Sequence, residues 1–238
     1  MSLRKYFIKN PITYKIYIYY NLFIRNKAHK KRKHYSQWGE DIYIQKYFDN
    51  KKKGFYVDIG CFHPIMYSNT CLLFNAGWQG INIDLNQTSI DLFNILRPND
   101  YNICAAISDT NSERDIFFDH NFSPINTLQK SFYDNSNKEI AFKNLEVKKI
   151  LTKTFSDIIK NIPNLPKIDF LNIDCEGHDY SVLKGFDLQN YNPKLICIET
   201  HDTNDNKVEK YENIISLLDK YNYEFIERSG PSSFFSKL

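Results

Sequence analysis

Short apolar segments that alternate with helical patterns constrain this 238-residue chain more than any other feature of its sequence. Strands that read as continuous apolar runs and are joined through helices are typical of a parallel sheet covered by helices on both faces. We therefore expect an α/β fold. The apolar segments are GFYVDIG (54–60), GINIDLN (80–86), YNICAAISD (101–109), IDFLNIDCEG (168–177) and KLICIETHD (194–202), and the helical patterns cover residues 36–48, 69–78, 88–98 and 207–220.

Weaker patterns extend this scheme at several places. Residues 113–118 and 145–151 alternate like an extra strand pair, and the polar stretch 119–138 between them is interpreted as a loop or lid. Thr154 and Asp157 have the spacing of a capping box that opens a short helix. Ser36 is a candidate N-cap for the helix over 36–48. The last 16 residues, YEFIERS and SSFFSKL with a turn between them, predict an antiparallel hairpin.

Carboxylates stand at the ends of four of the five apolar segments. They are Asp58, Asp84, the pair Asp174 and Glu176, and Glu199, which is followed by His201. In a parallel sheet the ligand lies beyond the carboxyl ends of the strands, so these side chains are expected to gather at one edge.

This acidic edge argues against a phosphate ligand. Asp58-x-Gly60 follows a strand, but the dense glycines that cradle a pyrophosphate are missing. A cationic nucleoside without phosphates fits better, and S-adenosyl-L-methionine has this chemistry. Gly60 is expected to let the backbone pass close to that ligand. Asp84, at the end of the next strand, is expected to accept hydrogen bonds from both ribose hydroxyls.

The segments SQWGEDIYI, GFYVDIGCFHP, SNTCLLFNAGWQGINIDLN, IDFLNIDCEGHDYSVLKGF and ICIETH together resemble the FkbM family of S-adenosylmethionine-dependent methyltransferases. The resemblance runs in order over about residues 35–202. It implies a class I, Rossmann-like methyltransferase sheet of about seven strands that is mostly parallel. It also implies methyl transfer to an oxygen, often a sugar hydroxyl.

The resemblance also implies positions of the cofactor site. Asp58 and Gly60 match the first cofactor motif, Asp84 matches the ribose-binding acid, and Asp174 with Glu176 matches the motif after the fourth strand. Gln37, Gly39 and Glu40 match an upstream motif that covers the cofactor. Cys61 and Phe62 stand where many members have a small residue and Asn.

Four further positions are open to two interpretations each. Ser68 and Asn69 either cap the helix over 69–78 or turn toward the carboxylate of the cofactor, where the N-terminus of that helix helps. Ala105, with its neighbour Ala106, either admits an adenine ring or is a small core residue.

The catalytic candidates are Glu176, His178, Glu199 and His201, because an alcohol needs an acceptor for its proton. Glu199 and His201 are two apart on a strand, so they are expected to share a face. Three interpretations remain open for them. In the first, the Glu199 carboxylate orients the His201 imidazole, and the two act together as the catalytic base. In the second, they bind a divalent metal together with Asp174, and in the third they form a structural hydrogen-bond cluster.

Residues 1–34 form a basic arm that differs from the rest of the chain. The arm has ten Lys and Arg residues and no acid, which leaves residues 35–238 with a net charge of −7, since the whole chain carries +3. Its apolar stretch 11–24 is too short to span a membrane. Packing or self-association, docking on an anionic membrane surface, and nucleic-acid binding through residues 27–34 are the alternatives, the last the least supported. We expect an arm (1–34) and one methyltransferase domain (35–238).

These observations predict a cytoplasmic O-methyltransferase that acts on a hydroxyl of a sugar, a nucleotide sugar or a glycan precursor, with a peripheral position at the inner face of a membrane as one possibility. The five cysteines form no C-x-x-C pair, and no secretory signal is evident, which favours a reducing compartment. The rival hypotheses are a binding module of the same fold without catalysis, a methyltransferase of a non-sugar small molecule and, least favoured, a nicotinamide oxidoreductase.

Overall fold

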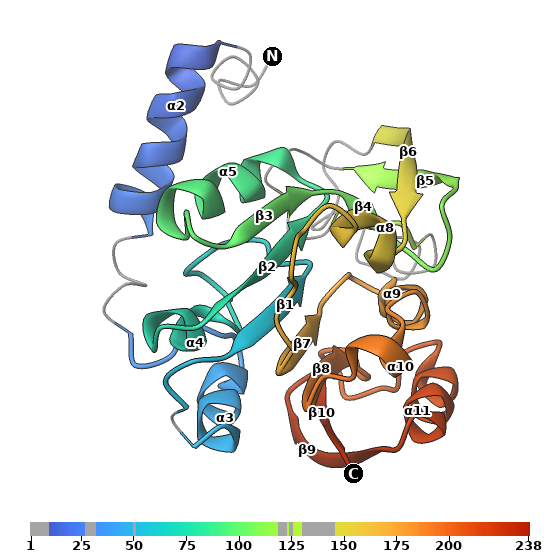
Figure 1. Cartoon of the computed structure of the whole chain (residues 1–238). Helices are drawn as coiled ribbons and strands as arrows, with labels where there is room; N and C mark the ends of the chain where they lie inside the picture. Colours follow the sequence, from blue (N-terminus) through green and yellow to red (C-terminus); the bar gives the residue numbers. More distant parts are fainter. Residues whose placement is uncertain (1–9, 27–31, 50, 119–122, 124–125, 130–145) are drawn as a thin grey trace.

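The computed structural model describes residues 10–26, 32–49, 51–118, 123, 126–129 and 146–238. Within this part of the chain, one seven-stranded sheet runs through the molecule in the order β3-β2-β1-β7-β8-β10-β9 (Figure 1). All neighbours are parallel except β10, which is antiparallel to β8 and β9. The strands are β1 (Phe55–Ile59), β2 (Gln79–Asp84), β3 (Tyr101–Cys104), β7 (Phe170–Ile173), β8 (Leu195–Glu199), β9 (Tyr223–Ser229) and β10 (Ser232–Lys237).

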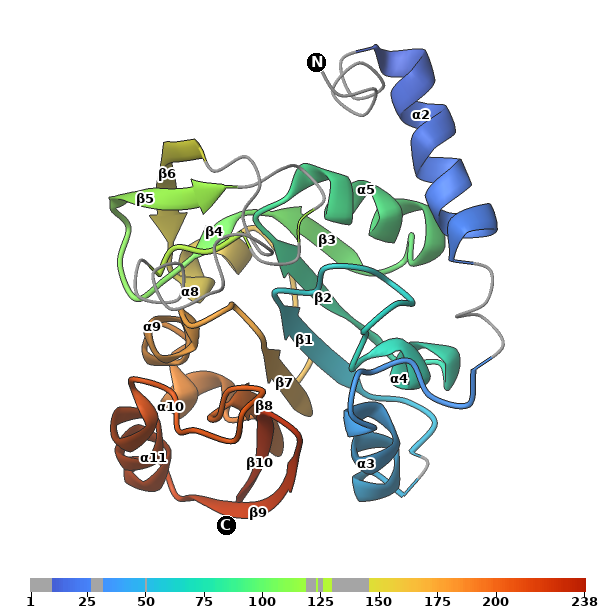
Figure 2. The same ribbon diagram turned by 180° about the vertical axis from the view of Figure 1, so that it is seen from behind.

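Helices cover both faces of the sheet (Figures 1 and 2). One face packs against residues of α8 (Phe155–Ile159), α9 (Asp179–Lys184), α10 (Leu188–Tyr191) and α11 (Tyr211–Lys220), which form the larger hydrophobic core. The other face packs against α3 (Glu40–Tyr47) and α4 (Cys71–Asn75), together with Trp78. All residues of β1 and β7 are buried, as their continuous apolar sequences predict. The predicted α/β fold with a C-terminal antiparallel hairpin is confirmed.

The strand order reverses at β1, which pairs with β2 on one side and with β7 on the other. Ligands of open α/β sheets bind beyond the carboxyl ends of the strands at such a switch point. The site is therefore expected where Ile59, Asp84 and Ile173 end their strands.

A second, three-stranded sheet of order β4-β6-β5 lies beyond this edge. Its strands are β4 (Ala106–Ile107), β5 (Glu113–Phe118) and β6 (Glu146–Lys153). The predicted extra strand pair is thus confirmed as β5 and β6. The predicted strand over 101–109 is divided after Cys104, and its second half joins the smaller sheet. Most of the predicted lid, 119–138, lies outside the described residues.

Local capping explains several element boundaries. Thr154 Oγ1 accepts a hydrogen bond from the Asp157 amide at 3.3 Å, so the predicted cap of α8 is confirmed. The prediction that Ser36 caps the helix over 36–48 was wrong, because the chain turns through Gly39 at φ +89° before α3 begins at Glu40. Ser36 instead accepts hydrogen bonds from the amides of Gly39 and Asp41, which fixes this turn.

The described part of the basic arm forms α2 (Pro11–Tyr20), followed by a π-helical turn, η1 (Asn21–Arg25). Ile18 and Leu22 pack on Leu92 of α5 (Gln87–Leu96), and the Tyr14 hydroxyl donates to Asp91 on the same helix. In the described residues, no helix is both long and apolar enough to cross a bilayer.

Candidate functional site

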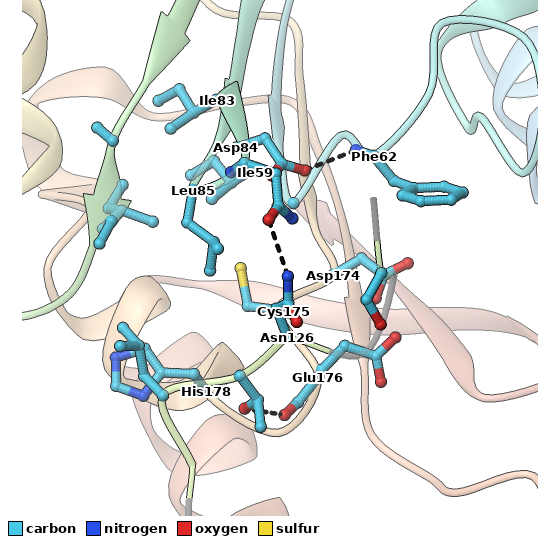
Figure 3. A pocket seen from close by; sticks show the side chains of 18 residues that line it. Ile59, Phe62, Ile83, Asp84, Leu85, Asn126, Asp174, Cys175, Glu176 and His178 are labelled. Carbon is cyan, nitrogen blue, oxygen red and sulfur yellow. Dashed lines mark hydrogen bonds between the residues drawn. The ribbon is translucent and has the colours of Figure 1, made fainter. Parts of the chain in front are cut away.

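A pocket lies at the carboxyl ends of β1, β2 and β7, where the switch point predicts a ligand (Figure 3). Its apolar wall comes from Ile59, Ile83, Leu85 and Ile107, with Ala105 and Ala106 beside them. Its polar groups are Asp84, Asn86, Asp174, Glu176 and His178, together with Ser123, Asn126 and Thr127 from the loop that precedes β6. An apolar wall with a few convergent polar groups is typical of a small-molecule site.

Asp84 is held in place by the backbone. Its Oδ2 accepts from the Phe62 amide at 2.9 Å, and its Oδ1 accepts from the Asn86 amide at 2.7 Å. Burial raises the pKa of Asp84 to about 6, and the two backbone donors oppose this rise. Each oxygen has a further lone pair, so the carboxylate can accept two more hydrogen bonds from neighbouring hydroxyls.

Gly60 has a structural role in addition to the predicted one. It has φ +81°, and a Cβ at this position would lie 1.7 Å from the backbone oxygen of Asp174. Its amide donates to Ile83 O at 2.9 Å, and the Asp174 amide donates to Ile59 O at 3.0 Å. Gly60 lines the pocket, but the close approach that requires a glycine is to the end of β7.

Carboxylates gather beside the pocket at the ends of β7 and β8. Burial, followed by the charges of neighbouring acids, raises the pKa of Asp174 to about 8. Burial and the charges of Asp174 and Asp179 raise the pKa of Glu176 well above its ordinary value. The pKa of Glu199 is raised in the same way, by burial and then by Asp174, Asp179 and Glu176. Figure 3 shows the Asp174 and Glu176 carboxylates near one another at the same side of the pocket.

The turn after β7 fixes the direction of Glu176. Glu176 has φ +51° and Gly177 has φ +86°, so both residues are in the left-handed region. Asp179 accepts from the amides of Cys175 and Gly177, each at 3.0 Å, and the Thr127 hydroxyl donates to Glu176 O at 2.8 Å. A bulky side chain held in this region by surrounding hydrogen bonds is a frequent mark of a functional position.

His178 contributes a neutral imidazole to the pocket. Its Nε2 lies 3.0 Å from Ser108 Oγ, and its buried Nδ1 has no hydrogen-bond partner in the described part of the chain. Burial lowers the pKa of His178 to about 4, so the ring is uncharged at neutral pH. An orphaned ring nitrogen beside a pocket is available to a polar group of a ligand.

Asp58, Ser68 and Asn69 lie behind the pocket and not in its lining. Asp58 accepts from the Thr70 hydroxyl at 2.6 Å and from Asn172 Nδ2 at 2.9 Å. Asn69 donates to the same Asn172, and Ser68 accepts from the Arg97 guanidinium. These groups form a buried network between β1 and α4. Cys61 also lies outside the lining, in a small core with Ile90 and Phe93.

The upstream motif reaches the acidic cluster through Glu40. Gln37 is exposed, and neither it nor Gly39 lines the pocket. Glu40 is buried, its Oε2 accepts from the Trp38 amide at 2.8 Å, and its charge acts on both Asp174 and Glu199. Glu40 is therefore the residue of this motif whose charge acts on the acids beside the pocket.

Glu199 and His201 do not share an environment. Glu199 is surrounded by acids, whereas the His201 ring stacks edge-on against Tyr211, and its Nδ1 lies 2.9 Å from Thr200 Oγ1. In the described residues, no group of three His, Cys, Asp or Glu side chains is placed to hold a metal ion. The predicted metal set of Asp174, Glu199 and His201 is thus not brought together.

Several lining residues were missed from the sequence. Asn86 follows Asp84 by two positions, and this short spacing after a strand was the one available signal. Asn126 Nδ2 donates to Asn86 Oδ1 at 2.8 Å, but Asn126 and Thr127 lie in a polar loop without periodicity. Their place in the pocket follows from the fold of the loop.

Comparisons with known proteins identify the family of this chain. The family model described as "Methyltransferase FkbM domain" matches residues 54–225. No curated protein matches the chain. A solved structure, methyltransferase FkbM from Methylobacillus flagellatus KT, is similar with 12% sequence identity and a TM-score of 0.49. The match covers 77% of this chain and 44% of that one, so the chain spans less than half the length of that protein. Because the family model covers most of the sequence, the chain belongs to the FkbM methyltransferase family.

Proposed function

We propose that the chain is an S-adenosyl-L-methionine-dependent O-methyltransferase that acts on a hydroxyl of a sugar, a nucleotide sugar or another glycan precursor. The observation that carries this proposal is the group of half-buried carboxylates, Asp174, Glu176 and Glu199, beside a pocket that contains Asp84. Acids with raised pKa values favour a ligand of positive charge, since a cation stabilises their ionised forms.

The residues of the pocket fit such a cofactor. Asp84 has lone pairs for a ribose diol, and the small side chains of Ala105 and Ala106 leave room for a flat ring against Ile83 and Ile107. When bound, S-adenosyl-L-methionine would supply the methyl group. Asp174 and Glu176 would then lie near its charged sulfur and amino groups.

Glu176 is the best-placed acceptor for the proton of the substrate hydroxyl. Burial and the charges of Asp174 and Asp179 raise its pKa well above the ordinary value, and a carboxylate with a raised pKa is a stronger base. The left-handed turn and the hydrogen bond from Thr127 keep its backbone fixed. Asp174 and Asp179 sustain the raised pKa, and the uncharged His178 offers a ring nitrogen to a polar group of the ligand on the opposite side of the pocket.

The affinity for the cationic cofactor should depend on pH. The pKa values of Asp84 and Asp174, about 6 and about 8, lie above their ordinary value of 3.8. At these two acids the ligand-free protein therefore holds more protons than the unfolded chain between about pH 4 and pH 8, so their contribution to stability falls as the pH rises through this window.

As these acids ionise, binding of S-adenosylmethionine should strengthen relative to S-adenosylhomocysteine, which lacks the positive sulfur. We expect the ratio of the two affinities to rise about tenfold from pH 5.5 to pH 8, as measured by titration calorimetry. A ratio that is independent of pH would contradict the role of the acidic cluster. Stabilisation by NAD in place of both compounds would contradict the proposal itself.

Replacing the proposed base should impair turnover more than binding. We expect Glu176→Gln to lower kcat by about 10²-fold while the affinity for S-adenosylhomocysteine changes little. The measurement is transfer of labelled methyl into a panel of sugars and nucleotide sugars, with and without a chelator. Glu113→Gln, at an exposed position on β5, is the matched control.

His201→Ala tests the rival base. Loss of turnover in this variant, with Glu176→Gln still active, would move proton acceptance to the end of β8. Cofactor binding without transfer to any acceptor in the panel would favour the non-catalytic module, and transfer only to non-sugar acceptors would replace the substrate class.

A further inference from the structure

The outer face of α2, which continues onto Ile24 of η1, exposes an apolar stripe to solvent. Ile12, Ile16 and Ile24 are 73%, 60% and 65% exposed, and Tyr19 and Tyr20 are 45% and 47% exposed. Their spacing of three and four residues places them on one side of a helix. This outer face, made of these five residues, is separate from the candidate methyltransferase pocket.

The opposite side of the same helix is firmly attached to the domain. Ile18 and Leu22 are 3% and 0% exposed and pack on Leu92 of α5. The Tyr14 hydroxyl donates to Asp91, and Asn26 Nδ2 lies 3.2 Å from His63 Nε2 in the loop after β1. The helix is therefore a fixed support, and its outer face points away from the domain (Figures 1 and 2).

The charged side chains of the arm are all positive. Lys15 on α2 and Arg25 on η1 are exposed, as are Arg32 and Lys33 further along the chain. The first 34 residues carry ten Lys and Arg and no acid, whereas the remainder of the chain carries a net −7. The stripe of aliphatic and tyrosine side chains is apolar, and the charges of the arm are positive. The partner of this face must therefore accept apolar side chains and also carry negative charge.

We propose that the outer face of α2 docks on the surface of an anionic lipid bilayer. Ile12, Ile16 and Ile24 would enter the boundary between headgroups and acyl chains, and the Tyr hydroxyls would stay at the level of the headgroups. The surrounding Lys and Arg residues would meet lipid phosphates, and each such contact adds to the attraction. A short helix that lies in the surface in this manner does not need to span it.

A second copy of the chain fits this face less well. A symmetric pair would bring the exposed Lys15 and Arg25 of both copies to the same seam, and like charges that close repel. Nucleic acid also fits less well, because phosphates gain nothing from five exposed apolar and aromatic side chains on the contact surface.

The test is co-sedimentation of the full chain with vesicles. We expect binding to vesicles that mix phosphatidylcholine with phosphatidylglycerol and about tenfold weaker binding to phosphatidylcholine alone. Raising the salt concentration from about 0.1 M to about 0.5 M should also weaken the binding to mixed vesicles about tenfold. Ile16→Glu should reduce that binding about tenfold, because an acid replaces the centre of the stripe.

Leu151→Glu is the matched control. Leu151 is 69% exposed on β6, so the change removes a similar side chain and adds the same charge elsewhere on the molecule. The melting temperature of each variant is measured first, and Ile12→Glu replaces Ile16→Glu if the latter does not fold. Equal loss of binding in the control and the test variant would overturn the proposal.

Two other outcomes would also overturn it. Equal binding to both kinds of vesicle, insensitive to salt, would remove the electrostatic part of the argument. A concentration-dependent dimer that Ile16→Glu separates, with no vesicle binding by the wild type, would assign the face to a second copy. Because the assay needs neither cofactor nor acceptor, its result is independent of the proposed methyl transfer.

Discussion

Gly60→Ala is expected to destabilise the protein by about 4 kcal/mol or more, so that little of it folds at 37 °C. The new methyl group would lie 1.7 Å from the backbone oxygen of Asp174, far inside any real contact distance. That oxygen belongs to the central part of the sheet, where the Asp174 amide is hydrogen-bonded to Ile59. Neither β1 nor β7 can move away without breaking this pairing. The measurement is urea unfolding followed by circular dichroism.

Gly39→Ala separates the clash from the cost of backbone conformation. Gly39 has φ +89°, close to the φ +81° of Gly60, but a Cβ there would meet nothing within 4 Å. This variant should lose only about 1–2 kcal/mol, the usual cost of the left-handed region for a residue with a side chain. Equal losses in the two variants would show that the contact with Asp174 is not what requires a glycine.

Arg97→Met is expected to cost about 3–5 kcal/mol, since it leaves buried acids without their cation. Arg97 is 0% exposed, and its guanidinium donates to Thr70 at 2.8 Å, to Ser68 at 3.0 Å, to the Pro64 carbonyl and to the Tyr56 hydroxyl. Its charge also lowers the pKa values of Asp58 and Asp100, which burial raises. The variant should unfold at lower urea concentration.

Arg114→Met is the control for this change. Arg114 makes an ion pair with Asp109 at 2.8 Å, and its side chain is 34% exposed. Solvent screens such a pair, so the same substitution there should cost at most about 1 kcal/mol. If the two variants were equally stable, the buried network around Arg97 would not be a source of stability.

The order of strands and helices could be predicted because apolar runs and helical periodicity are local properties. The buried runs around Val57, Leu171 and Ile196 specify central strands without any knowledge of their partners. The position of Asp84 in the pocket was also predictable, because it is the last residue of β2 and therefore meets the sheet edge.

Side-chain direction within a strand was the part that sequence patterns did not resolve. Asp58 is one residue inside β1, and the alternation of side chains turns it toward Thr70 and Asn172 and away from the pocket. Arg97, its buried cation, is 39 residues further along the chain, in a segment that reads only as the end of a helix. Polar networks of this kind join residues that are distant in the sequence. They depend on tertiary packing, which the pattern of a short sequence segment does not reveal.

Phe62 belongs to two parts of the molecule at once. It lines the pocket, it has φ +47°, and its ring packs with the cluster of Ile18, Leu22 and Leu92 beneath α2. Any event that shifts α2 against α5 therefore changes the energy of the pocket wall. By thermodynamic reciprocity, a pocket ligand that prefers one position of Phe62 would alter the affinity of the proposed α2 surface for a bilayer by the same factor. A single aromatic ring is thus the contact that would couple the two surfaces.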